Sequence, residues 1–276
     1  VRQSDFHDDA SVIPLFEGME SPADLREPFW VEGTLESYLD KRRTGISNTY
    51  FSLPYPGWDI SGLTELRGAE VINLHWVARF LSPVSLQRLF SLGKPVVWTL
   101  HDQHPFSGGC HYSAGCEGYR LECSGCPQIE PGPFDLPAMV LKDKAELWRG
   151  AQPVIVTPSL WMAGCASASA LFKGLRIEVI PNGIDTEEFK PGNREEVRKR
   201  LGIEPDAFVV LFSADNLMEK RKNIASLCTC LNACLEDLTF ADRARKGKTR
   251  VLAFGSGSEE VQGRIGLPVS GLGRLS

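Results

Sequence analysis

Short apolar runs, rich in β-branched residues, alternate with amphipathic stretches through the middle of the chain. Four such runs lie at residues 69–76 (AEVINLHW), 94–102 (KPVVWTLHD), 153–159 (PVIVTPS) and 176–183 (RIEVIPNG). Continuous apolar runs of this length are typical of strands that are buried on both faces of a parallel sheet. Their alternation with helical stretches therefore predicts an α/β fold, with helices covering both faces of a parallel sheet.

Helix start and stop signals separate these runs. Ser82-Pro83 has the pattern of an N-cap followed by proline in the first turn, and Gly93 is a suitable stop for the helix that it opens. Further helices are predicted from about Leu136 to Trp148 and from Ser159 to near Gly174. The chain from residue 61 to 185 thus has the alternating order of a Rossmann-like domain.

The two ends of the chain have a different character. Residues 1–60 are rich in proline, glycine and aromatic residues, and they are predicted to form an irregular part of the first domain with one helix near Thr34–Arg42. Residues 186–276 begin a second unit, with predicted elements at 187–203 (charged helix), 208–216 (strand), 222–238 (helix) and 249–260 (strand). Two strands and one crossover do not complete a doubly wound domain, so this unit is expected to be only partly present.

Composition argues against some classes of function but does not identify one. The 276 residues are 42% hydrophobic and 24% charged, and the formal net charge of -5 does not suit a nucleic-acid binder. No run approaches the ~20 apolar residues of a membrane span. The first ten residues lack the basic start and apolar core of a signal peptide, which favours a cytoplasmic, reducing compartment.

Ligands of open parallel sheets bind beyond the carboxyl ends of the strands. That rule selects five residues as candidates: His75, His101, Asp102, Ser159 and Asn182. A histidine at such a position can act as a base or donate a hydrogen bond to a sugar hydroxyl, and an adjacent aspartate can orient it. The alternative is a strand-end histidine that only bonds to local backbone.

The second unit offers a basic stretch, Glu219-Lys220-Arg221-Lys222-Asn223, between a strand and a helix start. Amide groups at a helix N-terminus bind anions, so a diphosphate would fit there; the alternative is an exposed basic turn. Gly255 and Gly257 end the next strand and would let a ligand approach the backbone. The dinucleotide and P-loop fingerprints do not occur at a strand–helix junction, which disfavours redox enzymes and P-loop NTPases.

Four of the eight cysteines lie close together in the loop 103–135: Cys110, Cys116, Cys123 and Cys126. The spacing is compatible with a structural zinc ion held by four thiolates, with His104 or His111 in place of one of them. Free thiols or a disulfide are the alternatives. No other cofactor is indicated.

Five segments of the chain together resemble the family 4 glycosyltransferases of the GT-B fold, in particular their bacterial exopolysaccharide and lipopolysaccharide branch. The segments are VINLHWVARFLS, GKPVVWTLHDQHPFSGGCHYSAGCEGYRLECSGCPQI, VTPSLWMAGCASASALF, VIPNGIDTEEFKP and KRKN. The resemblance covers about residues 58–275. It implies two Rossmann-like domains with parallel sheets, the second only partly present.

The resemblance also implies residue roles. Family members bind the acceptor in the first domain and the nucleotide sugar in the second, retain the anomeric configuration and need no catalytic metal. His101, with Asp102, matches the active-site histidine, and His75 and Asn182 are expected on the acceptor side. Lys222 matches the lysine that contacts the donor diphosphate, and Gly255 matches a loop near the nucleotide. Arg221 and Asn216 are expected on the donor side as well.

Some family features have no counterpart. Asn216 stands where an arginine is often found before the lysine, and a glycine-rich first strand and a glutamate-bearing EX7E segment are missing. The sequence thus predicts a transferase that moves a sugar to a saccharide or lipid-linked acceptor in cell-surface polysaccharide biosynthesis. It would work in the cytoplasm, with peripheral association at the inner face of the membrane as one option. A truncated, inactive sugar- or nucleotide-binding remnant of the family is the alternative, and a redox protein with a zinc clip is a third.

Overall fold

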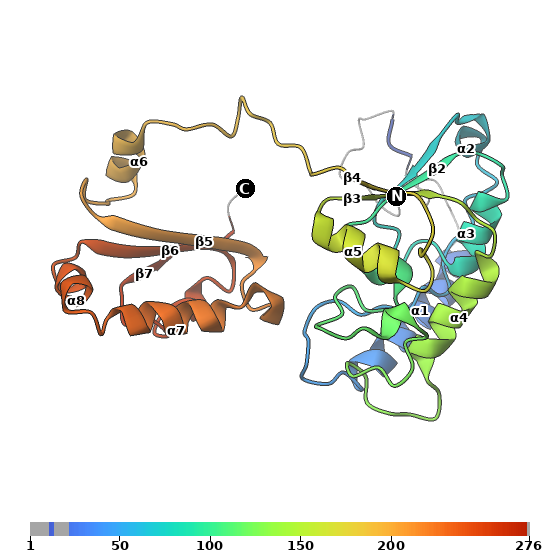
Figure 1. Cartoon of the computed structure of the whole chain (residues 1–276), viewed down its shortest axis with the longest axis horizontal. Helices are drawn as coiled ribbons and strands as arrows, with labels where there is room; N and C mark the ends of the chain where they lie inside the picture. Colours follow the sequence, from blue (N-terminus) through green and yellow to red (C-terminus); the bar gives the residue numbers. More distant parts are fainter. Residues whose placement is uncertain (1–10, 14–21, 275–276) are drawn as a thin grey trace. The chain divides into compact units, whose positions relative to one another are not determined.

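The computed structural model describes residues 11–13 and 22–274. The chain divides into two compact units, one ending at Asn182 and the other beginning at Gly183 (Figure 1). This division lies close to the predicted start of the second unit after Asp185. The calls on residues 1–10, 14–21 and 275–276 fall outside the described part of the chain.

The first unit contains a four-stranded parallel sheet. Its strands are β1 (Ile72–Leu74), β2 (Val96–Thr99), β3 (Val154–Thr157) and β4 (Ile177–Val179), paired in chain order. All three pairings are parallel, and each strand is a segment of one of the four apolar runs. The predicted α/β fold with a parallel sheet is confirmed here.

Helices precede the first strand and connect the strands that follow. They are α1 (Pro22–Asp40), α2 (Thr64–Gly68), α3 (Pro83–Phe90), α4 (Leu136–Leu147) and α5 (Leu160–Ala168), with short 3-10 turns η1 (His104–Phe106) and η2 (Gly118–Arg120). Side-chain oxygens of Ser82, Asp135 and Ser159 cap α3, α4 and α5 by accepting a backbone N–H from the first turn. The capping predicted at Ser82 and Ser159 is therefore confirmed.

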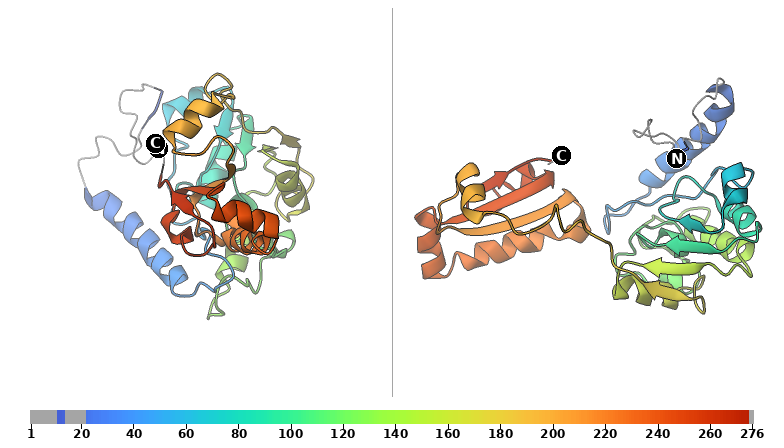
Figure 2. Two further views of the ribbon diagram at one scale, coloured as in Figure 1. Left: turned by 90° about the vertical axis from the view of Figure 1, so that its left-hand side faces the viewer. Right: turned by 90° about the horizontal axis from the view of Figure 1, so that it is seen from above.

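Two helix boundaries were predicted wrongly. The helix expected near Thr34–Arg42 is the end of α1, which begins at Pro22. Its start was missed because the sequence of α1 has little helical amphipathicity. The helix expected to end near Gly174 stops at Ala168, because the Ser169 hydroxyl donates back to the Ala166 carbonyl and accepts from the Phe172 amide. Figure 2 shows α1 on the outer side of the first unit, away from the strands.

The core of the first unit lies between the sheet and its helices. Trp98 of β2 is 1% exposed and packs edge-to-face on Trp148, with ring centroids 5.5 Å apart. Leu100 and Ile155 are fully buried beside it. The sheet is thus firmly anchored up to the points where β2 and β3 end.

The second unit contains a three-stranded parallel sheet of β5 (Phe208–Asn216), β6 (Thr249–Ser256) and β7 (Val269–Gly271). Its helical elements are α6 (Arg194–Arg200), η3 (Lys220–Lys222), α7 (Ile224–Cys234), α8 (Leu238–Arg245) and η4 (Glu259–Val261). The second parallel sheet confirms the fold class. The expectation of only two strands was wrong, because β7 is a three-residue strand without a long apolar run.

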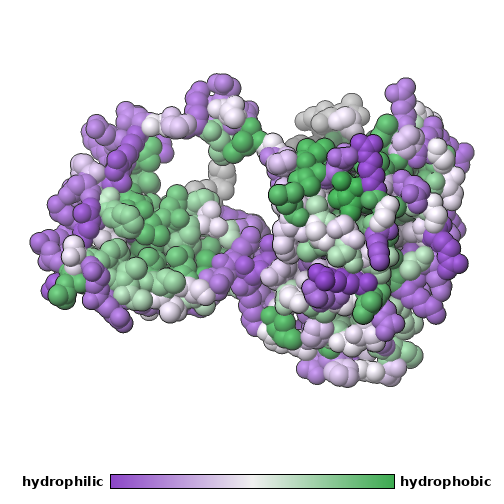
Figure 3. Space-filling view, in the orientation of Figure 1, coloured by the Kyte–Doolittle hydropathy of each residue, from purple (hydrophilic) through white to green (hydrophobic). Residues whose placement is uncertain are grey.

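The helix predicted over 222–238 is interrupted. It ends as α7 at Cys234, and Asp237 begins α8 by accepting the Phe240 amide. Val251 and Ala253 of β6 pack with Ile224 of α7, and hydrophobic residues gather over this sheet and helix in Figure 3. No single helix in the described residues is long and apolar enough to cross a membrane. The segments Lys220–Cys234 and Leu238–Arg245, which are bent by 98° relative to each other, pass the test of length and composition only when they are taken together.

Candidate functional site

Two histidines meet at the carboxyl edge of the first sheet. His75 follows β1 and His101 follows β2, and because β1 and β2 are parallel neighbours, both residues leave the sheet at the same edge. His75 Nδ1 lies 2.9 Å from His101 Nε2, and the rings stack with centroids 5.2 Å apart. Both side chains are exposed. The structure thus brings together two of the residues selected by the strand-end rule.

A chain of hydrogen bonds fixes which ring nitrogens carry protons. The Thr99 hydroxyl donates to Asn73 Oδ1 at 3.3 Å, and Asn73 Nδ2 donates to His75 Nε2 at 3.1 Å. A nitrogen that accepts a hydrogen bond has no proton, so neutral His75 carries its proton on Nδ1 and donates it to His101 Nε2. The proton of a neutral His101 then lies on Nδ1. In the described part of the chain no hydrogen bond occupies that N–H, which can serve a ligand.

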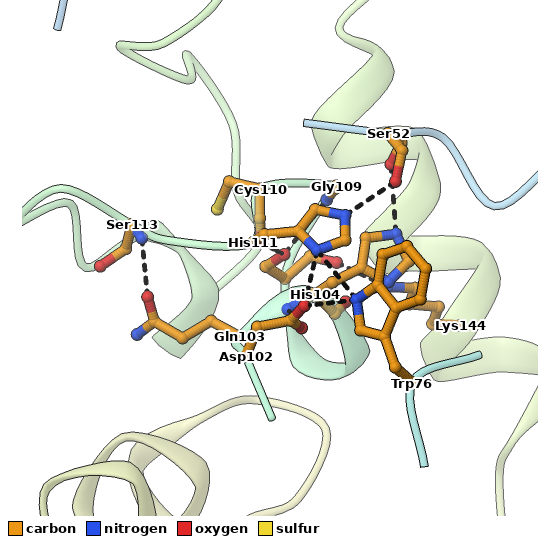
Figure 4. A network of polar contacts seen from close by, with 11 residues as sticks. Ser52, Trp76, Asp102, Gln103, His104, Gly109, Cys110, His111, Ser113 and Lys144 are labelled. Atoms are coloured by element: carbon orange, nitrogen blue, oxygen red, sulfur yellow. Dashed lines mark hydrogen bonds and ion pairs between the residues drawn. The ribbon is translucent and has the colours of Figure 1, made fainter. Parts of the chain in front are cut away.

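Asp102 is held by donors on both carboxylate oxygens. His111 Nδ1 lies 2.6 Å from Oδ2, Trp76 Nε1 donates to the same oxygen at 2.8 Å, and the His104 amide donates to Oδ1 at 2.9 Å (Figure 4). Burial by itself would raise the pKa of Asp102, but these hydrogen bonds outweigh it and lower the pKa below its usual range. The ionised carboxylate uses its hydrogen bonds to hold the loop after β2 in place, so Asp102 is a positioning residue.

Ser52, His111 and Asp102 form a line that resembles a serine nucleophile with its base. The Ser52 hydroxyl lies 2.9 Å from His111 Nε2, and His111 Nδ1 faces the carboxylate. A nucleophile must reach its substrate, yet Ser52 is 1% exposed and His111 6% exposed. The geometry thus supports an internal brace that joins residue 52 to the strand-end loop, and it does not support a hydrolase.

Acid should remove the contribution of Asp102 to stability. Its folded-state pKa is lowered, so the carboxylate stabilises the fold above the unfolded-state pKa of about 3.9 and loses this effect as pH falls through the folded-state value. We expect Asp102→Asn to have a lower free energy of unfolding than wild type at neutral pH. The gap should narrow below about pH 4.

Urea denaturation from neutral pH to about pH 2.5 measures the difference in the free energy of unfolding between wild type and Asp102→Asn. Asp40→Asn, which alters an exposed carboxylate on α1, serves as the control and should show little difference at any pH. A gap that stays constant down to about pH 2.5 would contradict the assigned ionisation of Asp102.

The loop 103–135 is anchored from within by buried polar groups. Gln103 Oε1 accepts the Ser113 amide at 2.6 Å, and Gln128 Nε2 donates to the Tyr112 carbonyl at 2.8 Å. Lys144 of α4 is 1% exposed and its Nζ donates to the carbonyls of His104 and Ser107 at 2.6 and 2.9 Å. These bonds fix the start of the loop against the helix that follows it.

All eight cysteines are free in the structure, so the disulfide alternative is not observed. Burial raises the pKa of Cys110 to about 12 and that of Cys123 to about 11. Within residues 11–13 and 22–274, no three His, Cys, Asp or Glu side chains are already grouped as metal ligands. The zinc hypothesis therefore stays a prediction.

The other two strand-end candidates are not among the hydrogen-bond partners of the histidine pair in the described residues. Ser159 is occupied as the cap of α5, where its hydroxyl accepts the Met162 amide at 3.2 Å. Asn182 is exposed at the end of the first unit, and in the described chain it takes no part in the His75–His101 hydrogen bonds. The acceptor-side role of Asn182 stays a prediction.

In the second unit the basic stretch forms η3 and leads directly into α7. Arg221 forms an ion pair with Glu219 at 2.6 Å, whereas exposed Lys222 forms no ion pair within the described residues. Asn223 has a left-handed backbone (φ 55°) and provides no side-chain cap for α7. The first amides of α7 are therefore left without a capping side chain, next to a free ammonium group.

The two other donor-side candidates have structural roles of their own. Asn216 ends β5 and its Oδ1 accepts the Met218 amide at 2.9 Å. Gly255 has φ 115°, and a Cβ there would lie 1.7 Å from the Ala214 carbonyl oxygen. The close approach of β5 and β6 therefore requires glycine at 255 whether or not a nucleotide binds nearby.

Several residues of this site could not be recognised from the sequence. Ser52 lies 59 residues before its partner His111, and Trp76 and Asn73 are ordinary members of an apolar run. The contact of His111 with Asp102 was also not predicted, although His111 had been named as an alternative metal ligand. Only the fold brings these side chains to the carboxyl edge of the sheet.

No family model matches the chain. A stretch of 125 residues, 41% of the chain, is 32% identical to the "Putative colanic acid biosynthesis glycosyl transferase WcaC" of Escherichia coli (strain K12) and covers 28% of that protein. Another stretch of 38 residues, 14% of the chain, is 47% identical to D-inositol 3-phosphate glycosyltransferase 1 of Catenulispora acidiphila and covers 9% of it. The chain is similar to glycosyltransferases.

The matched stretches span less than a third of the length of either relative. The predicted resemblance to glycosyltransferases is thereby confirmed at this general level, together with the α/β fold. Membership of family 4, the GT-B arrangement and the substrates stay predictions.

Proposed function

We propose that the protein is a retaining glycosyltransferase of family 4 with the GT-B fold. It would move a sugar from a nucleotide-sugar donor to a saccharide or lipid-linked acceptor in cell-surface polysaccharide biosynthesis. The observation that carries this proposal is the exposed His75–His101 pair at the carboxyl edge of a parallel sheet, in a chain similar to glycosyltransferases.

The first unit supports a sugar site. Sugar hydroxyl groups both donate and accept hydrogen bonds, and the His101 ring, whose direction is set by its bond to His75, presents Nδ1 to a ligand. A rigid donor of this kind loses little entropy when a ligand binds. In this proposal His101 contacts the transferred sugar, and His75 and Asn182 belong to the acceptor side.

The second unit supports a diphosphate site. The amides at the start of α7 carry partial positive charge, and Lys222 adds a full charge beside them. When the bond from the anomeric carbon to the donor phosphate breaks, negative charge grows on the leaving diphosphate. Lys222 and these amides would stabilise that charge. The acceptor oxygen would form the new bond on the same face of the sugar and pass its proton to the leaving diphosphate.

This chemistry needs no metal for the transfer step, because Lys222 and the α7 amides supply the positive charge. We place the reaction in the cytoplasm. A lipid-linked acceptor would bring the protein to the inner face of the membrane as a peripheral protein. The exposed side chains of Leu160 and Trp161 at the start of α5 support such an association, since Trp and Leu favour membrane interfaces.

A donor screen tests the proposal. UDP-, GDP- and ADP-sugars are compared by thermal shift on the purified protein, and any stabilising donor is then used radiolabelled in a transfer assay. Stabilisation by one donor class together with transfer, or slow hydrolysis, supports the enzyme. Binding without turnover would support the inactive remnant, and stabilisation by nicotinamide nucleotides alone would overturn the proposal.

Lys222→Ala is expected to weaken binding of the nucleotide sugar about 10- to 100-fold. A hydrogen bond to a charged group contributes about 1.5–3 kcal/mol, which corresponds to this range of Kd. Calorimetry with the donor found in the screen measures the change. Lys199→Ala removes an equally exposed charge from α6 and should leave Kd unchanged; equal affinities for both variants and the wild type would remove Lys222 from the site.

A further inference from the structure

The four clustered cysteines surround one small cavity. Cys110, Cys116, Cys123 and Cys126 all line it, at the side of the loop 103–135 that faces Phe51 and the start of α4. Its accessible volume is about 10 Å³, near the lower limit for one water molecule. The fold therefore brings the four cysteines to the lining of one small space, although they are spread over seventeen positions.

Backbone amides point at three of these sulfurs. The Gly108 amide donates to Cys123 Sγ and the Gly118 amide to Cys116 Sγ, each at 3.3 Å, and the Gln128 amide bonds to Cys126. Such bonds strengthen when the sulfur is an anion, because charge-assisted hydrogen bonds are about twice as strong as neutral ones. The amide hydrogen bonds would therefore gain strength when the thiols lose their protons to bind a metal ion.

A basic side chain lies near two of the four cysteines. Lys144 lies close enough to Cys110 and Cys123 to interact with them electrostatically, and it is buried. Four thiolates around a divalent ion carry a net charge of about −2, which a buried ammonium group would partly balance. This arrangement gives the buried lysine a counter-charge inside the protein.

The structure narrows the ligand set to the four cysteines. His111 uses Nδ1 on Asp102 and Nε2 on Ser52, and His104 Nε2 lies 3.2 Å from the Ser52 carbonyl oxygen. His111 therefore cannot replace a thiolate without breaking the brace around Asp102, and His104 would have to give up the Ser52 carbonyl to bind through Nε2. An all-sulfur set of four ligands is typical of Zn²⁺ in tetrahedral structural sites.

We propose that Cys110, Cys116, Cys123 and Cys126 bind one structural Zn²⁺ ion that holds the loop 103–135 in place. The sulfurs line the cavity without yet being grouped as ligands, so binding requires the thiols to turn inward. Each thiol that enters the coordination shell releases one proton, and the Zn–S distances become about 2.3 Å. Since Cys110 directly precedes His111, the ion also fixes the residue that braces Asp102.

Metal analysis of the purified protein tests this inference. Protein prepared under reducing conditions, without chelator or added metal, is expected to contain one zinc ion per chain. Co²⁺ exchanged into the site should give the visible absorption of tetrahedral cobalt and the near-ultraviolet bands of thiolate-to-cobalt charge transfer. Neither readout depends on sugar transfer, so failure of the proposed function would leave this result untouched.

Matched cysteine variants complete the experiment. Cys116→Ser and Cys126→Ser should reduce bound zinc to about a tenth of the wild-type content or less, whereas Cys165→Ser and Cys230→Ser, outside the cluster, should retain it. If the cluster variants do not fold, the cobalt spectrum of the wild type shows whether thiolates bind the metal. Absence of zinc and of cobalt–thiolate bands in reduced wild type would overturn the proposal, as would a disulfide among the four cysteines in freshly purified protein.

Discussion

His101→Ala is expected to lower kcat for sugar transfer about 100-fold while Kd for the nucleotide sugar changes little. The free Nδ1–H of His101 is held in one direction by its bond to His75, so it can act on the transferred sugar without reorganising. Loss of one preorganised donor in an active site typically costs about 10²–10³ in rate. In the proposed function, donor binding depends mainly on Lys222 and the α7 amides of the second unit, so it should persist.

Single-turnover kinetics with the radiolabelled donor, combined with calorimetry, separate the two effects. His75→Ala is the comparison variant, because it removes the hydrogen bond that orients His101 and leaves His101 in place; it should lower kcat about tenfold, the value of one hydrogen bond. Wild-type kcat for His101→Ala would remove the pair from the active site. Equal losses in kcat and donor affinity would instead place His101 in ground-state binding.

The strands of the first unit could be predicted from sequence because their apolar runs have only one stable environment, the interior of a parallel sheet. Capping residues such as Ser82 and Ser159 then marked the helix starts locally. The missed elements lacked such signals. α1 has no apolar stripe, and β7 spans only Val269–Gly271 and is recognised by its pairing with β6.

The histidine pair could be anticipated from topology alone. Neighbouring parallel strands end at one edge, so the residues that follow β1 and β2 must come close together. The brace could not be anticipated, since Ser52 reaches His111 across 59 positions through a segment with no regular period. Long-range contacts of this kind depend on packing, which a single sequence does not display.

The role of Asp102 could not be predicted from its residue type and its position after a strand. Its place after β2 made it a candidate beside His101, and the structure places it there. Three donors surround the carboxylate, and this arrangement commits it to holding the loop. The two adjacent residues therefore have different roles. His101 is exposed and accessible to a ligand, whereas Asp102 is mostly buried and holds the loop.

Lys144→Met is expected to lower the free energy of unfolding by about 3 kcal/mol. Methionine keeps most of the buried stem but leaves the carbonyls of His104 and Ser107 without a donor, and each unsatisfied buried group costs about 1–3 kcal/mol. Burial lowers the pKa of Lys144 to about 7. A neutral amine still has two N–H groups, so both carbonyls keep their donor in either protonation state.

Urea denaturation of Lys144→Met beside Lys142→Met measures this effect. Lys142 lies on the same helix with a side chain that is 74% exposed, and its replacement should change stability by less than about 0.5 kcal/mol. Increased hydrogen exchange in Lys144→Met should concentrate in the loop 103–135, because the lysine holds the start of that loop. Equal stabilities of the two variants would show that water or a backbone shift satisfies both carbonyls, and the lysine would then lose its role as the anchor of the loop.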